Sequence, residues 1–265
     1  KGGVLVKCFF FGQEQGCGTS SNMAALAVRL SLKYRKKIIL LEAGKGRNAI
    51  EPLFYGGMEH RKVRENCAYF LRQGYDYFSQ CDAYNAKDLE RTLKELVTGH
   101  LYLFPMGERE LPLLQPWSYQ DTLKDMVEKL EELADYVFVD CGTTELRDMK
   151  FLRGKDDLCI VTFRQSVECM NRFFLEQYDT ANRCFYLMGN YQPASVYNRQ
   201  NLYRMYRIPP GCCGVVPYNP QFQYACQRGK LKQYLTEHGA LWQQERDKEF
   251  RREMDFISEA VLGGM

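Results

Sequence analysis

The sequence predicts an α/β fold: a doubly wound, mostly parallel sheet with helices on both faces. Short apolar runs alternate along the chain with longer segments whose apolar residues recur at helical spacing, an order typical of parallel sheets. The chain has 265 residues and is 45% apolar, enough to bury one large core. With no linker or repeat in the sequence, we expect a single domain over residues 1–265.

The apolar runs are expected to form the strands and the segments between them the helices. The segment 121–133 places Leu123, Met126 and Leu130 on one face and leads directly into the next apolar run, which is a helix-then-strand unit. The predicted strands cover residues 4–11, 38–41, 101–104, 136–139, 158–163, 184–188 and 214–216.

Two segments leave alternatives open. Residues 44–85 are the least regular and crowd Tyr and Phe together, which we interpret as core or helix packing, with a partner surface as the alternative. Residues 241–261 mix apolar and charged side chains. We expect them to form a helix docked on the sheet, and contact with a membrane is the alternative.

Charge and cysteine content narrow the class of protein. The 36 basic and 33 acidic residues give a net charge of +3, which is no strong nucleic-acid signal. No apolar run reaches the roughly 18 residues that span a bilayer, and no signal-peptide pattern is present, so we expect a cytoplasmic protein. The 11 cysteines lie mostly in apolar runs without zinc spacing and are expected to be reduced.

The most informative segment follows the first apolar run. A turn containing Gly12, Gly16 and Gly18 leads into an Ala-rich helical segment. Backbone N–H groups at such a turn, together with the N-terminus of the following helix, attract phosphate. The alternative is a glycine turn that binds nothing. The residues predicted to bind nucleotide here are Gln15, Gly16, Cys17, Gly18, Thr19, Ser20 and Ser21.

Gly16-Cys17-Gly18 followed by Ser20 and Ser21 resembles the deviant Walker A loop of the MinD/ParA group of P-loop proteins. Two lysines of that group are missing, because Glu14 stands in place of the signature lysine and Thr19 in place of the general phosphate-binding lysine. A carboxylate at position 14 would face phosphate with the wrong sign. Either Glu14 points outward, or the protein does not form the nucleotide sandwich dimer of its relatives.

Later segments extend the resemblance over almost the whole chain. Residues 136–143 resemble the Walker B strand and end near Asp140, and residues 186–191 resemble the strand whose Asn, here Asn190, contacts adenine. Residues 214–219 resemble the closing segment of the group. The resemblance implies that ATP or ADP binds with Mg²⁺, that Ser20 and Asp140 hold the metal, and that Asn190 lies near the base.

Hydrolysis is expected to be weak or absent. In the group, the second acid of a D-x-D motif positions water. In this sequence Glu42 keeps an acid at the first position of the motif, and Gly44 replaces the second acid. Catalysis of phosphoryl transfer depends on positioning and charge neutralisation, and losing one such group typically costs about 100- to 1000-fold in rate. We therefore assign no catalytic residue and expect at most a weak ATPase, although the loop, Ser20 and Asp140 still suit binding.

A Thr in place of the loop lysine resembles the TadZ/CpaE-like branch of the group. That branch is associated with Flp (tight-adherence) pilus assembly at the cell pole and commonly carries a receiver-like domain ahead of the P-loop domain. The resemblance implies a nucleotide-binding scaffold that positions protein partners of pilus or secretion machinery, with a homodimer and a location at the pole or the inner membrane face. The alternative is an active ParA/MinD-type ATPase in DNA partitioning or membrane-dependent positioning.

Overall fold

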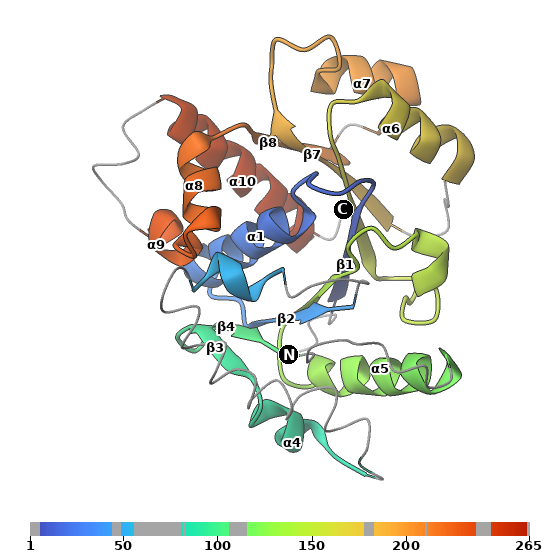
Figure 1. The fold of residues 1–265 in the computed structure, drawn as a ribbon, viewed down its shortest axis with the longest axis vertical. Coiled ribbons are helices and arrows are strands. Elements are labelled where there is room, and N and C mark those ends of the chain that lie inside the picture. Colours follow the sequence, from blue (N-terminus) through green and yellow to red (C-terminus); the bar gives the residue numbers. More distant parts are fainter. Residues whose placement is uncertain are drawn as a thin grey trace.

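The computed structural model describes residues 6–43, 49–55, 81, 83–105, 116–177, 183–209, 211–236 and 245–263. In this part of the chain an eight-stranded sheet has the order β3-β4-β2-β5-β1-β6-β7-β8 (Figure 1). All neighbouring pairs are parallel except β3 with β4, so the predicted fold class is confirmed. The strands are β1 (Val6–Gly12), β2 (Ile38–Glu42), β3 (Lys94–Val97), β4 (Leu101–Leu103), β5 (Tyr136–Asp140), β6 (Leu158–Phe163), β7 (Arg183–Tyr191) and β8 (Cys213–Pro217).

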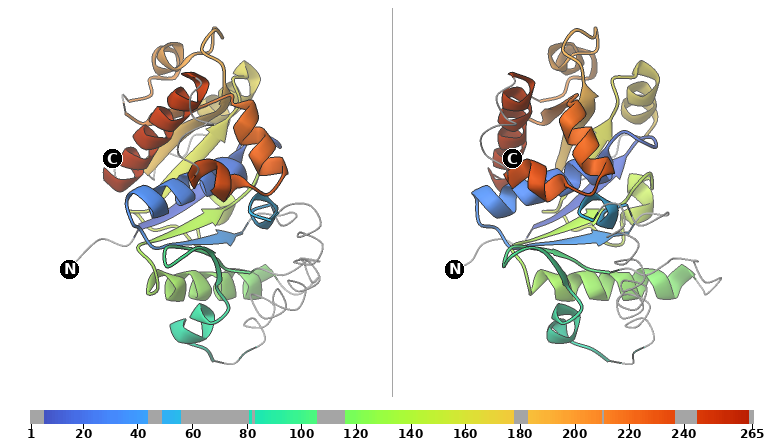
Figure 2. Two further views of the ribbon diagram at one scale, coloured as in Figure 1. Left: turned by 90° about the vertical axis from the view of Figure 1, so that its left-hand side faces the viewer. Right: turned by 60° about the vertical axis from the view of Figure 1, so that its left-hand side comes forward.

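Helices cover both faces of the sheet (Figures 1 and 2). One buried cluster joins one face to α1, α8, α9 and α10, and a second joins the other face to α4, α5, α6 and α7. The helices are α1 (Thr19–Lys33), α4 (Ala86–Glu90), α5 (Pro116–Glu131), α6 (Val167–Asn171), α7 (Arg199–Tyr206), α8 (Pro220–Gln227), α9 (Leu231–Thr236) and α10 (Glu245–Gly263), with the short turns η1 (Glu51–Leu53), η2 (Leu146–Met149) and η3 (Arg172–Gln177).

Strand β1 lies near the middle of the sheet because its side chains are apolar on both faces. Phe9, Phe10 and Phe11 are fully buried, as expected for a strand covered by helices on each side. In the parallel register, Phe10 pairs with Asp140 of β5 and Gly12 pairs with Thr162 of β6. The carboxyl ends of these strands therefore meet at one edge of the sheet, where open α/β sheets bind ligands.

Strand β3 was not predicted from the sequence. Its four residues, Lys94–Val97, carry two charges and give too short an apolar run to be recognised. Leu96 and Val97 are nevertheless buried, so the strand completes the sheet as an antiparallel edge. Helix α5 is also longer at its start than the predicted 121–133, and most of the irregular region 44–85 lies outside the described residues.

Helix α10 packs against β8 at the edge of the sheet, so the docked helix predicted over residues 241–261 is confirmed for residues 245–261. Phe250, Met254 and Ile257 are buried, and a Cβ at Gly214 of β8 would lie 2.7 Å from Ile257 Cγ1. The missing side chain at Gly214 lets the helix approach the strand closely. No helix among the described residues combines the length and apolar character needed to cross a membrane.

Candidate functional site

The glycine turn links the end of β1 to the start of α1. Gly16 and Gly18 have φ values of 73° and 91°, a left-handed conformation that glycine adopts without steric cost. The Cys17 N–H donates to the Glu14 carbonyl at 3.4 Å and closes the turn. Gly18 is the N-cap of α1 and offers no side-chain cap, so the first-turn N–H groups, which have no intrahelical acceptor, are available to an anion.

The backbone of strand β7 packs directly against the backbone of the glycine turn. A Cβ at Gly189 would lie 2.1 Å from the Cys17 carbonyl oxygen, closer than any side chain permits. The backbones of β7 and the turn therefore touch because residue 189 is glycine. Gly12 is also restricted, since its Cβ would lie 2.5 Å from the side-chain oxygen Thr19 Oγ1.

Thr19 turns inward beneath the loop. It is 7% exposed, and its hydroxyl lies 3.1 Å from Cys17 Sγ. The position that normally carries the loop lysine therefore holds a short, neutral, buried side chain.

Asn22 lies one turn along α1 and is also buried, with 4% of its surface exposed. Its Nδ2 has no hydrogen-bond partner within the described structure, and it is 3.2 Å from the position of a Cβ on Gly18. An unsatisfied buried donor is costly. Its place beside the glycine turn fits a ligand that brings an acceptor, and phosphate is such a ligand.

Asp140 ends β5 next to the turn and is 4% exposed. Burial raises the pKa of its carboxyl, while hydrogen bonds from Ser20 and from the Gly142 N–H oppose that shift. The Gly142 bond measures 2.9 Å. A buried carboxylate beside a Ser hydroxyl is the oxygen pair that Mg²⁺ uses together with phosphate oxygens and water. The described residues contain no group of three or more His, Cys, Asp or Glu side chains that could hold a metal ion by themselves. Phosphate oxygens and water would complete the coordination of Mg²⁺ here.

Arg164 follows β6 and lies against the outside of the turn. Its Nη2 donates to the Gln15 carbonyl at 3.2 Å and to the Gly16 carbonyl at 3.1 Å. Its Nε is 3.5 Å from Glu14 Oε1. Glu14 is thus paired with an arginine of its own chain.

The residues after β2 are only partly described. Glu42 accepts hydrogen bonds from the N–H groups of Ala49, at 2.5 Å, and Ile50, at 2.9 Å, so its carboxylate holds the start of the described segment 49–55. Gly44, which replaces the second acid of the D-x-D motif, lies outside the described residues.

Asn190 follows Gly189 at the carboxyl end of β7. It is exposed, has a φ of 52°, and accepts a hydrogen bond from Gln223 Nε2 of α8 at 3.0 Å. The fold therefore brings it to the same edge of the sheet as the turn, one residue from the contact with Cys17. No described contact joins Asn190 to Ser20 or Asp140.

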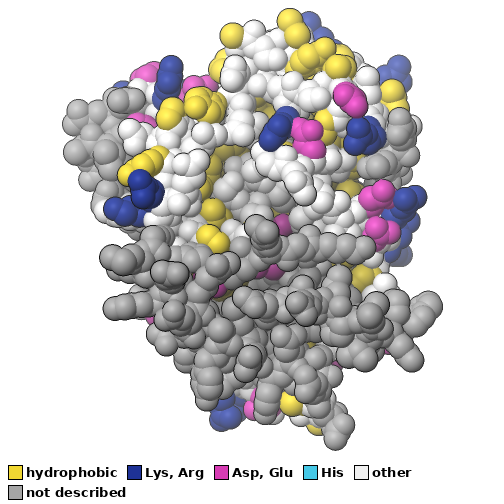
Figure 3. All heavy atoms as spheres, viewed as in Figure 1, with side chains coloured by type: hydrophobic (Ala, Val, Ile, Leu, Met, Phe, Trp, Pro, Cys, Tyr) yellow, Lys and Arg dark blue, Asp and Glu magenta, His cyan; other side chains and the backbone are white. Residues whose placement is uncertain are grey.

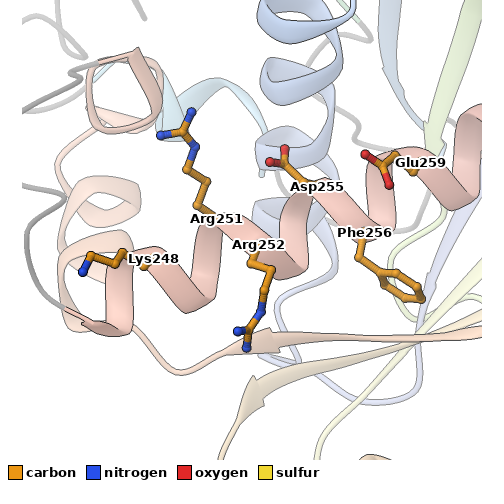
Figure 4. Close-up of a pocket in the computed structure, with 6 residues that line it drawn as sticks. All are labelled: Lys248, Arg251, Arg252, Asp255, Phe256 and Glu259. Carbon is orange, nitrogen blue, oxygen red and sulfur yellow. The ribbon is translucent and has the colours of Figure 1, made fainter.

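Two other surfaces are distinct from the glycine turn. A hollow of about 460 Å³ runs along α10, and Figure 4 shows its charged side chains, with Asp255 pointing toward α1. Asp255 pairs with Arg29 and Lys33, which places this part of the hollow beside the end of α1 far from the turn. The hollow is lined by Lys248, Arg251, Arg252, Asp255, Phe256 and Glu259.

The face drawn in Figure 3 mixes positive and negative side chains over its described part, in keeping with the balanced composition. Hydrophobic side chains gather near α7, where Val196 and Met205 are 69% and 50% exposed.

Three residues of this edge were missed in the sequence analysis. Arg164 belongs to no phosphate-binding pattern, and only its place directly after an apolar strand could have drawn attention. Asn22 is a polar residue directly before the apolar stretch 23–28 of its helix, a detectable signal. Gly189 precedes Asn190 in a strand, where glycine often marks a close backbone approach.

No protein-family model matches the sequence, and none of the curated proteins does. Solved structures do match. The ParA family ATPase from Chlorobium tepidum TLS has a TM-score of 0.65 at 12% identity, covering 98% of this chain and 99% of that one. MinD in the MinC:MinD cell division protein complex of Aquifex aeolicus has a TM-score of 0.62 at 14% identity, covering 97% and 96%.

A third match is the septum site-determining protein MinD complexed with Mg-ADP from Pyrococcus horikoshii OT3. Its TM-score is 0.61 at 13% identity, covering 97% of this chain and 95% of that one. At such low identity the likeness concerns the fold, and it extends over nearly the whole of each chain. The chain therefore has the P-loop NTPase fold of the MinD and ParA ATPases.

Proposed function

We propose that this protein binds an adenine nucleotide, ATP or ADP, with Mg²⁺ at the turn between β1 and α1, and that it positions partner proteins. The observation that carries the proposal is the turn itself. The turn contains two left-handed glycines and is followed by the first-turn N–H groups of α1, which have no acceptor within the helix. The buried, unpartnered Asn22 Nδ2 lies beside Gly18. Phosphate supplies the acceptors that this set of donors lacks.

The residues present also suit Mg²⁺. Ser20 lies close enough to Asp140 to lower the pKa of its carboxyl, and Mg²⁺ is usually bound by one or two protein oxygens together with phosphate oxygens and water. The bound metal would offset the charge of the phosphates and of the Asp140 carboxylate. MinD from Pyrococcus horikoshii, which has this fold, holds Mg-ADP. In this chain Asn190 would lie on the side of the base.

Hydrolysis is proposed to be weak or absent. Thr19 is neutral and buried, so it supplies no charge at the terminal phosphate. Glu14 is paired with Arg164 within the chain, and a carboxylate at this position does not replace the signature lysine. Binding depends mainly on backbone donors, which these substitutions leave in place.

The partners are proposed to be proteins. MinD of Aquifex aeolicus, which has this fold, forms a complex with MinC. Exposed apolar side chains such as Val196 and Met205 offer a surface for a partner near the nucleotide edge. Pilus or secretion machinery at the cell pole or the inner membrane face is the setting that the resemblance to the TadZ/CpaE-like branch favours, and a homodimer is the proposed assembly.

Titration of the protein with a fluorescent ADP analogue, with and without Mg²⁺, tests the proposal. Gly18→Asp should weaken binding at least about tenfold, because it adds a carboxylate beside the phosphates. Gly211→Asp is the matched control, since Gly211 has a φ of 92° against 91° for Gly18 and has open space around its Cβ position. Absence of binding by the wild-type protein at millimolar nucleotide would contradict the proposal.

A further inference from the structure

A guanidinium contacts two carbonyl oxygens of the glycine turn. Arg164 Nη2 bridges the carbonyl oxygens of Gln15 and Gly16 at 3.2 and 3.1 Å. A Cβ at Gly16 would lie 2.7 Å from that nitrogen, so the missing side chain at Gly16 makes the contact feasible. Arginine suits this role because its rigid fork presents several donors at fixed angles.

The bond to the Gln15 carbonyl also orients an N–H group. The peptide group is planar and trans, so the N–H of Gly16 points away from the carbonyl of Gln15 in the same peptide. When Arg164 holds that carbonyl on the outer side, the Gly16 N–H is directed to the inner side of the turn. An anion at α1 would meet this donor already in place.

The same side chain forms an ion pair with Glu14. The Glu14 carboxylate lies 3.5 Å from Arg164 Nε. Repulsion between this carboxylate and a phosphate is therefore reduced by the adjacent cation.

We propose that Arg164 is a positioning residue that organises the lysine-free turn for nucleotide phosphates, by holding its carbonyls outward and neutralising Glu14. The inference rests on the proposed nucleotide binding. Arg164 acts on the loop, and the phosphates contact the backbone donors that it orients. The Arg164 guanidinium thus acts through the backbone of the turn, without contacting the phosphates.

The test compares Arg164→Gln and Arg164→Lys with Arg172→Gln. Arg172 is an equally exposed arginine paired within its own helical segment, so its loss controls for charge. Amide hydrogen exchange of residues 12–21 without nucleotide should accelerate about tenfold in Arg164→Gln, and affinity for the fluorescent ADP analogue should fall by a similar factor. Arg164→Lys should be intermediate, because lysine can pair with Glu14 but lacks the fork.

A double variant separates the charge effect from loop packing. Glu14→Gln added to Arg164→Gln should recover part of the lost affinity, because no unpaired carboxylate then remains beside the phosphates, and a purely structural role predicts no recovery. Wild-type exchange and affinity in Arg164→Gln would overturn the inference while leaving nucleotide binding intact. Faster exchange in a protein that binds no nucleotide would instead refute the proposed function and support the role of Arg164 in the loop.

Discussion

Gly189 of β7 and Cys17 of the glycine turn are in backbone contact, and a Cβ on Gly189 would lie 2.1 Å from the Cys17 carbonyl oxygen. Two segments about 170 residues apart in sequence thus define one edge of the site. The neighbour is a backbone atom and cannot rotate away as a flexible side chain could. Any side chain at 189 must displace either the strand or the turn.

Gly189→Ala should therefore lower the free energy of unfolding by about 1–3 kcal/mol, the usual cost of overpacking. It should also weaken nucleotide binding at least about tenfold, because the turn moves. Denaturant unfolding and fluorescent nucleotide titration measure the two effects. Gly263→Ala is the control, because open space surrounds its Cβ position. Unchanged affinity in Gly189→Ala would show that this contact does not shape the site.

The buried carboxylate of Asp140 lowers the stability of the fold, although the same carboxylate is proposed to bind Mg²⁺. Burial raises the pKa of its carboxyl, so the folded state takes up a proton more readily than the unfolded state. The cost of burying the ionised group is thus largest at neutral pH and shrinks as pH falls through the folded pKa toward the unfolded value of about 3.9.

Asp140→Asn should consequently be more stable than wild type at pH 7 by about 1 kcal/mol, with the difference narrowing toward pH 4. The same variant should lose the Mg²⁺ dependence of nucleotide binding. Urea unfolding at a series of pH values, with titrations in Mg²⁺ and in chelator, checks both statements. A variant less stable than wild type at pH 7 would show that the hydrogen bonds of Asp140 outweigh its burial.

Asp255 should show the opposite pH dependence. Burial opposes ionisation of Asp255, but hydrogen bonds from Arg29 and attraction to Arg29 and Lys33 outweigh it and lower the pKa. A lowered pKa gives stability that is present above the unfolded value, about 3.9, and is lost as pH falls through the folded value.

Asp255→Asn should lower the melting temperature at pH 7 by about 2–4 °C, because it loosens α10 from α1, and the effect should disappear in strong acid. Glu245→Gln is the control, since Glu245 is 86% exposed in its ion pair with Lys248 and should have little effect. An equal effect of Asp255→Asn at pH 7 and pH 3 would argue for lost packing and against lost charge.

The fold could be predicted because the strands around β1 are short, apolar runs between amphipathic helices. Strand β3 could not, since Lys94–Val97 has two charged residues and is recognisable only beside β4. The glycine turn and Asp140 could also be predicted from the sequence, because each stands directly after an apolar run. Arg164 and Gly189 could not, because their importance lies in contacts with residues 149 and 172 positions earlier in the chain.

The proposal that hydrolysis is weak or absent can be tested directly. Wild-type protein should release phosphate from ATP well below about one per minute, because Thr19 supplies no cation and Gly44 cannot position water. Thr19→Lys combined with Gly44→Asp should raise the rate measurably, and Gln200→Lys, which adds the same charge on α7, should not. Nucleotide titration of each variant shows whether the turn still binds. A vigorous wild-type rate that Asp140→Ala abolishes would instead identify an active ATPase, in which another cation performs the role of the missing lysine.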